Sequence, residues 1–197
     1  MSKINSGKIF EQDVANSINK DVFFVHRLKD SAQSYNNSGA TSFTWNNPCD
    51  IFVYNPNNNI LFAIEEKTTK YNSFTFDNPY TNEKESKMIK RHQILSLQDF
   101  SKYKGLFPMF LFNFRDVGDD KIQITYAQHI NNFIKMINNI NGKKSFNLID
   151  LIDNNAIRIK GRKKITRYEW YIEDFFNLQT IDTVSYTHLR AHETRHD

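Results

Sequence analysis

The sequence has little cysteine and no long apolar run, and both shortages narrow the class of protein. The one cysteine in 197 residues, Cys49, cannot form a disulfide within the chain, which favours a reducing compartment. No stretch reaches the roughly 20 apolar residues of a membrane span. The N-terminal segment MSKINSGKIFEQDV also lacks the apolar core of a signal peptide. We therefore expect a cytoplasmic protein with no membrane partner.

The excess of positive charge is small, since the formal net charge is +4. This balance is compatible with a nucleic-acid partner but does not require one. The chain is long enough to fold as one domain with a core that needs no disulfide. We place a single domain at residues 1–183. Residues 184–197, VSYTHLRAHETRHD, resemble a translated sequencing adapter and predict a non-native or disordered tail.

Three histidines of that tail, His188, His192 and His196, recur at helical spacing. No apolar face would hold such a helix in place, so we do not expect a metal site there.

Hydrophobic periodicity predicts an α/β fold with the element order α-β-β-β-α-β-β-α. The first helix is expected at residues 6–19, with Ser6 as its N-cap and Phe10, Val14 and Ile18 on its buried side. The other expected elements are strands at 21–28, 49–54 and 60–67, a helix at 82–104, strands at 107–114 and 121–127, and a helix at 128–140.

Several local signals refine this arrangement. The helix at 82–104 is expected to bury Met88, Ile89, His92 and Leu95, with Leu97 or Gln98, and to end at Gly105. The continuous apolar run at 107–114 predicts a fully buried central strand. Residues 29–47 are polar and predict a loop. Residues 158–176 predict a basic strand or hairpin followed by a short helix.

Charged residues gather where two predicted strands meet. Side chains of a strand alternate between faces, so Glu65 and Lys67 share a face and Glu66 faces away. The Asn-rich turn at 55–59 favours a hairpin, which would bring Asp50 close to Glu65. Two neighbouring carboxylates repel each other unless a cation lies between them, and oxygen ligands suit Mg²⁺ or Mn²⁺.

Lys67 beside such a metal can stabilise an attacking hydroxide or the charge that builds on phosphorus. These groups together are the parts needed to hydrolyse a phosphodiester. The alternative is a solvated surface ion pair of little energetic value. The position after a strongly apolar strand, within a helix–strand–strand–strand–helix order, favours the site.

The same residues resemble a known family. Pro48-Cys49-Asp50 and AIEEK at 63–67 resemble the motif of the PD-(D/E)XK nucleases. SGKIFEQDV at 6–14 resembles the first helix of the RecU-like Holliday junction resolvases. Three further stretches are similar to that family, so that the resemblance covers roughly residues 6–140: EEKTTKYNSFTF at 65–76, KRHQILSL at 90–97 and GLFPMFLFNF at 105–114.

The resemblance implies a restriction-endonuclease-like core, a mixed central sheet flanked by helices, and a role for each matching residue. Asp50, Glu65 and the main-chain carbonyl of Glu66 would bind the metal, and Lys67 would be the catalytic lysine. Glu11 would act directly or through a metal-bound water, and Gln93 would orient phosphate or water. A solvated acid in the first turn of a helix is an equally good interpretation of Glu11. For His92 and Gln93, a position on the polar edge of an amphipathic helix is a somewhat better interpretation than a role in the site.

One departure concerns the substrate. RecU proper has a long stalk between its early strands, and here the corresponding loop at 29–47 is short and polar. Junction specificity therefore stays open, and a stalkless relative carried by a phage or mobile element fits this pattern.

A basic segment at 158–167 is a candidate for DNA contact. Lysine and arginine side chains supply sequence-independent affinity for phosphates, and a solvated charged hairpin is the alternative. Trp170 and Tyr171 after it are expected in the core beneath the terminal helix rather than stacked on bases. The six cations are Arg158, Lys160, Arg162, Lys163, Lys164 and Arg167.

The sequence thus predicts a Mg²⁺-dependent (or Mn²⁺-dependent) DNA endonuclease, most consistent with one that resolves Holliday junctions or related branched DNA. A restriction-like or other structure-specific nuclease is one alternative. A non-catalytic DNA-binding recombination factor is another, which the intact set of Asp50, Glu65 and Lys67 disfavours. A homodimer is expected because a junction has two strands to cut symmetrically. The first helix and residues 168–176 are its predicted surfaces.

Overall fold

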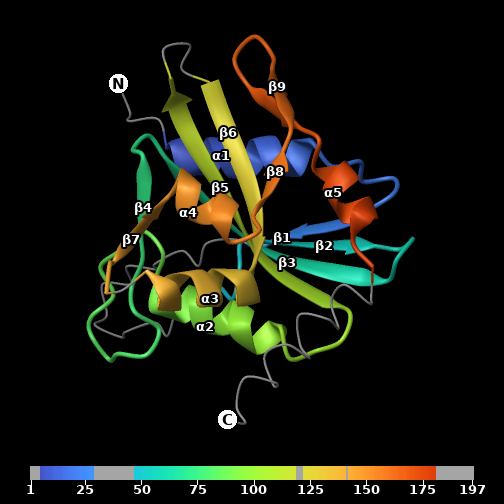
Figure 1. The fold of residues 1–197 in the computed structure, drawn as a ribbon. Helices are drawn as coiled ribbons and strands as arrows, with labels where there is room; N and C mark the ends of the chain where they lie inside the picture. The colour runs from blue at the N-terminus through green and yellow to red at the C-terminus, as the bar shows by residue number, and fades with distance from the viewer. Residues whose placement is uncertain (1–4, 29–46, 119–121, 141, 181–197) are drawn as a thin grey trace, which may run out of the picture.

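The computed structural model describes residues 5–28, 47–118, 122–140 and 142–180. A six-stranded mixed sheet lies at its centre, with helices on both faces (Figure 1). In spatial order its strands are β1 (Phe24–Arg27), β2 (Ile51–Asn55), β3 (Ile60–Thr69), β5 (Leu106–Val117), β6 (Ile122–His129) and β8 (Ile157–Ile159).

Two small sheets and five helices complete the described part of the chain. The small sheets pair β4 (Ser73–Thr75) with β7 (Ser145–Asn147), and β9 (Gly161–Lys163) with β10 (Tyr168–Trp170). The helices are α1 (Ser6–Asn16), α2 (Arg91–Phe100), α3 (Ile130–Asn139), α4 (Leu148–Asp153) and α5 (Ile172–Leu178).

The strands near the middle of the sheet follow the predicted pattern. β2 and β3 form the expected antiparallel hairpin, with Ile51 opposite Ile64. β3 runs parallel to β5, and β5 is antiparallel to β6, so the sheet is mixed. Every residue from Phe107 to Phe114 is buried, which confirms the prediction of a buried central strand. A strand covered on both faces has no polar side, and its sequence therefore shows no alternation.

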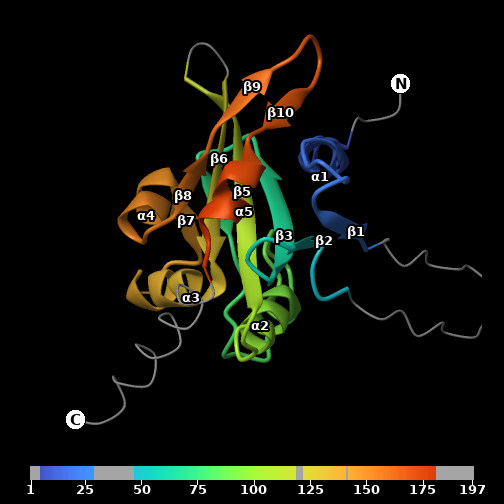
Figure 2. The same cartoon turned by 90° about the vertical axis from the view of Figure 1, so that its right-hand side faces the viewer.

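Each face of the sheet carries its own apolar cluster. One cluster joins α1 and α5 to the sheet through residues such as Phe10, Phe62 and Phe176. The other joins α2, α3 and the β4–β7 pair to the opposite face and includes Phe74, Phe112 and Phe133. In Figure 2, α1 lies at the upper right of the sheet and α3 at its lower left. The architecture is thus a mixed sheet between two helical layers.

The expected helix at 82–104 is shorter in the structure, and its predicted buried side is partly wrong. Helix α2 begins at Arg91, and residues 82–90 form a loop. The carboxylate of Asp77 accepts hydrogen bonds from the backbone N–H groups of Ser86 and Lys87, which holds that loop in a non-helical path. Met88 and Leu95 are exposed, whereas Ile94 and Leu97 are buried. The polar run before Met88 contains no apolar residue to pin a helical turn to the sheet.

Other differences lie at chain segments where tertiary contacts decide the structure. Asn5 rather than Ser6 caps α1, because its side chain accepts from the N–H groups of Gly7 and Lys8. The three-residue strands β4 and β7 were not predicted, since they depend on stacking of Phe74 against Phe146 across the chain. The basic hairpin and short terminal helix are present as β9, β10 and α5.

Some predictions fall outside the described residues. They are nearly all of the loop at 29–47, the end of the proposed domain at 181–183, and the tail at 184–197 with its three histidines. Within the described ranges, no helix has the length and apolarity needed to cross a membrane.

Candidate active site

Asp50 and Glu65 lie at the point where β2 and β3 separate. The backbone N–H of Asp50 donates to the carbonyl of Ile64 at 3.0 Å, directly before β2 begins at Ile51, and the pairing of the two strands ends there. Oδ2 of Asp50 accepts from the backbone N–H of Glu66 at 2.6 Å, so the carboxylate replaces a strand carbonyl as its partner. The carboxylates of Asp50 and Glu65 lie within hydrogen-bonding range of each other. The hairpin therefore brings together the two side chains that the sequence placed near each other.

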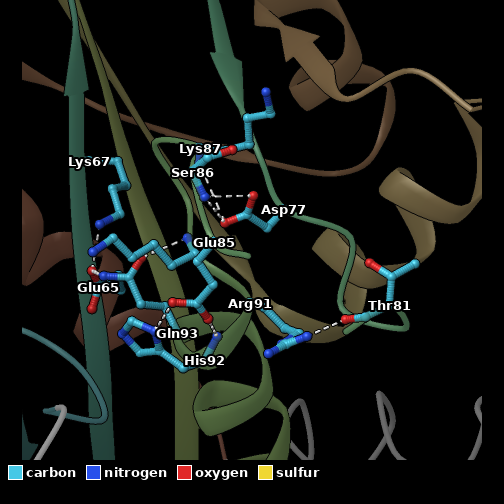
Figure 3. A network of polar contacts seen from close by, with 11 residues as sticks. Glu65, Lys67, Asp77, Thr81, Glu85, Ser86, Lys87, Arg91, His92 and Gln93 are labelled. Carbon is cyan, nitrogen blue, oxygen red and sulfur yellow. Dashed lines mark hydrogen bonds and ion pairs between the residues drawn. The ribbon is translucent and has the colours of Figure 1, made fainter. Parts of the chain in front are cut away.

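Glu65 is almost completely buried and is held by two donors (Figure 3). Nζ of Lys67 lies 2.7 Å from Oε1 of Glu65, and Nε2 of Gln93 donates to the same oxygen. Burial raises the pKa of Glu65 above its ordinary value, although the neighbouring Lys67 ammonium acts in the opposite direction. Asp50, Glu65, Lys67 and Gln93 thus form one polar cluster, which we call the carboxylate cluster.

Gln93 reaches this cluster from the first turn of α2. Its Oε1 accepts from the backbone N–H of Lys90 at 3.0 Å, so the amide caps the helix while its NH₂ group points to Glu65. This double contact fixes which way the amide points. His92 next to it contacts Glu85 instead, through Nδ1 at 2.7 Å and through its backbone N–H at 2.8 Å (Figure 3). The structure therefore separates the two neighbours on α2: Gln93 reaches the site, whereas His92 contacts the preceding loop.

Glu66 faces the opposite side of the sheet, as the alternation predicted, but it is not exposed. Its side chain is 6% exposed, and within the described residues both carboxylate oxygens lack a hydrogen-bond partner. Burial raises the pKa of Glu66 well above its ordinary value, and the charges of Asp50 and Glu11 raise it further. Sequence alternation alone gave no sign that this carboxylate would be buried.

Glu11 approaches the site from α1. Its Oε2 lies 2.6 Å from the Nη2 group of Arg27 on β1, which draws the first helix to the edge of the sheet. The charge of Glu11 acts on both Glu65 and Glu66. Sequence reasoning missed Arg27 and Glu85, because each makes its contact with a residue on another element.

The residues of the carboxylate cluster fit a metal of the proposed kind. In the described part of the chain, no group of three or more His, Cys, Asp or Glu side chains is arranged to hold a metal ion. Mg²⁺ commonly binds through one or two carboxylates and keeps several waters, so it does not need such a group. Asp50, which is half-buried, and Glu65, which is buried, are two adjoining carboxylates and form a donor set suited to that ion.

The basic segment divides into paired and unpaired cations. Arg167 contacts Asp13 of α1 at 2.5 Å, and Arg162 and Lys164 both contact Glu169, at 2.5 and 3.2 Å. Arg167 therefore fastens the hairpin to α1, which is a structural role that the sequence did not indicate. Arg158, Lys160 and Lys163 make no ion pair within the described residues and are the better candidates for DNA contact.

Replacement of Glu66 tests the difference between the two faces of β3. We expect Glu66→Met to raise the free energy of unfolding by roughly 1–3 kcal/mol, because it removes a buried carboxylate without partners. Denaturant unfolding in the absence of metal measures this change. Glu83→Met is the control, since Glu83 is exposed and its removal should change stability little. Equal changes in the free energy of unfolding for the two variants would mean that the buried carboxylate of Glu66 does not destabilise the fold.

No protein-family model matches this chain. The chain is 31% identical over 134 residues to the SPbeta prophage-derived uncharacterized protein YotM of Bacillus subtilis (strain 168). That stretch covers 68% of this chain and 60% of the relative, so the chain spans about three fifths of the relative's length.

One similar solved structure is that of Hjc, a Holliday junction resolvase from the archaeon Archaeoglobus fulgidus. The TM-score is 0.46 and the identity 14%, over 77% of this chain and 95% of that one. Similarity at this level does not carry an activity from one protein to another. The function must therefore be argued from the side chains of the carboxylate cluster.

Proposed function

We propose that the chain is a metal-dependent DNA endonuclease of the PD-(D/E)XK type that acts on branched DNA such as Holliday junctions. The carboxylate cluster is the observation that carries this proposal. Glu65 is only 2% exposed, although it contacts a lysine and a second carboxylate. A solvated surface ion pair would not be buried in this way. A fold that gathers these charges away from water is typical of a site with a chemical task.

The residues of the cluster suit the hydrolysis of a phosphodiester. Mg²⁺ or Mn²⁺ held by Asp50, Glu65 and the carbonyl of Glu66 would polarise the scissile phosphate when bound. The ammonium of Lys67 is placed to stabilise the negative charge that grows as water attacks phosphorus and the P–O bond breaks. Gln93 keeps Glu65 in position, and it is the nearest neutral donor to orient a phosphate oxygen or water.

A homodimer is part of this proposal, because one site can cut only one of the two strands of a junction. The inner sides of the predicted dimer surfaces are used within the chain. Trp170 is buried and packs edge-to-face with Phe10, with 6.0 Å between the ring centroids. Ile172, Phe175 and Phe176 are also buried. A second copy would therefore contact only the solvent sides of α1 and residues 168–176.

The relative YotM supports the view that the chain comes from a phage or mobile element, since its name records a prophage origin. Such a source is consistent with a nuclease that acts on recombining DNA.

Cleavage of matched substrates tests the proposed function. The purified chain is incubated with a labelled four-way junction and with a linear duplex of the same arm sequence, in Mg²⁺ and in EDTA. We expect paired symmetric nicks in the junction, in Mg²⁺ only. Equal cutting of the duplex would favour a restriction-like nuclease. Binding without cleavage in either Mg²⁺ or Mn²⁺ would favour a DNA-binding factor without catalytic activity.

A further inference from the structure

We propose that Ile165, at the tip of the β9–β10 hairpin, inserts between bases of a branched or kinked DNA. This inference rests on the proposed function, because it concerns how the same protein recognises its substrate. It assigns a role to a single apolar side chain that neither the fold nor the carboxylate cluster explains.

Ile165 is 97% exposed, the highest value among the large apolar side chains of the described residues. It lies in the turn between Lys164 and Arg167, where the N–H of Lys164 donates to the carbonyl of Arg167 at 2.8 Å. Tight turns favour Gly, Asn, Asp and Pro, and a β-branched apolar residue has no local advantage there. Single exposed apolar residues are common on protein surfaces. A fully exposed isoleucine at the tip of a turn, however, fits neither the usual hydrophobic pattern nor the residue preferences of turns, and it contributes nothing to folding.

The surroundings of Ile165 match a polyanion. Lys160 and Lys163 on the same hairpin make no ion pair within the described residues, and Arg158 stands just before it on β8. These cations would contact the phosphates of a bound DNA. The tip of the β9–β10 hairpin would then lie close to the bases. Proteins that kink DNA combine such cations with an apolar wedge, often isoleucine, leucine or phenylalanine, placed between base steps.

The hairpin is fixed to α1 along its second strand, from Arg167 beside the turn to Trp170. Arg167 and the backbone N–H of Tyr168 both contact Asp13 of α1, at 2.5 and 3.2 Å. The N–H of Trp170 donates to Ser17 at 2.9 Å. Trp170 also lies over Gly161, where a Cβ atom would come within 2.5 Å of its ring, so the two strands meet closely only because residue 161 is glycine.

The same helix connects the hairpin to the carboxylate cluster. Glu11, whose charge acts on Glu65, is two residues from Asp13, which holds the hairpin. In both views the hairpin projects past α1 and beyond the end of the sheet (Figures 1 and 2). Residues of α1 thus hold the hairpin and also act on the carboxylate cluster, so DNA bound at the hairpin would lie beside the helix that carries Glu11.

Base unstacking can be measured directly without cleavage. The probe is a four-way junction, or a linear duplex of the same sequence, with 2-aminopurine beside the branch point, in EDTA. We expect the wild-type chain to increase the fluorescence of the junction probe. Ile165→Ala should remove that increase and weaken junction binding by about tenfold, while duplex binding changes little. Its thermal unfolding should match the wild type because the side chain contacts solvent.

Lys163→Ala is the matched control on the neighbouring surface. It should weaken junction and duplex binding to a similar degree and keep the fluorescence increase. The proposal is overturned if Ile165→Ala retains the full increase and the junction affinity, or if the wild-type chain gives no increase. A chain that unstacks the probe through Ile165 but never cleaves in Mg²⁺ would refute the nuclease function alone. Normal junction cleavage with no effect of Ile165→Ala would refute the wedge alone.

Discussion

Asp50→Asn and Glu65→Gln are each expected to reduce DNA cleavage by about a thousandfold while DNA binding stays largely intact. Both substitutions remove a negative charge from the proposed metal ligands and keep the shape of the side chain. The amide oxygen of Gln at position 65 can still accept from Lys67 and Gln93, and the local structure should therefore persist. Gel-based cleavage of a labelled junction in Mg²⁺ measures the loss, with binding measured in EDTA.

The control for this pair is Asp99→Asn. Asp99 on α2 is an exposed carboxylate that contacts Lys102 beyond the end of the helix, outside the carboxylate cluster. Its replacement should leave cleavage unchanged. Undiminished cleavage by either Asp50→Asn or Glu65→Gln would refute the site assignment. An inactive Glu66→Gln with an active Glu65→Gln would show instead that the catalytic carboxylate lies on the other face of β3.

Phe62→Ala is expected to lower the free energy of unfolding by about 3–5 kcal/mol. Phe62 on β3 is fully buried. The centroid of its ring lies 4.5 Å from the ring centroid of Phe176 and 5.4 Å from that of Phe107. Its truncation removes some of the ring contacts through which α5 packs on the sheet and leaves a cavity. Because a loss of this size is a large part of the stability of a typical domain, chemical denaturation should detect it readily.

Phe24→Ala provides the matched control, since Phe24 on the edge strand β1 is 60% exposed. Its effect should stay within about 0.5 kcal/mol. If Phe62→Ala cost no more than Phe24→Ala, the terminal helix would not be part of the core. The proposal of a single domain that extends through α5 would then be wrong.

Local pattern was sufficient for the central strands and for three of the four residues of the carboxylate cluster. The hairpin of β2 and β3 has a short Asn-rich turn, and side chains alternate strictly along each strand. These two rules are enough to bring Asp50 next to Glu65 and to place Lys67 on the same face. The unbroken apolar run of β5 likewise identified a strand that is covered on both sides.

Contacts between distant parts of the chain decided the rest. The start of α2 depends on Asp77, which holds the preceding loop, and the position of Gln93 depends on where that start lies. Arg167 was assigned to DNA by its charge, but it meets Asp13 more than 150 residues away in the sequence. Propensity and periodicity act over a few residues, whereas these interactions exist only after the helices have packed on the sheet.

Glu66 shows the difference most clearly. Its sequence neighbours determine that it faces away from Lys67, because successive side chains of a strand point to opposite faces. Whether that opposite face is wet or buried is decided by α1, which covers it and brings Glu11 near. The direction of a side chain is a property of its own backbone, while its burial is a property of everything that packs against it.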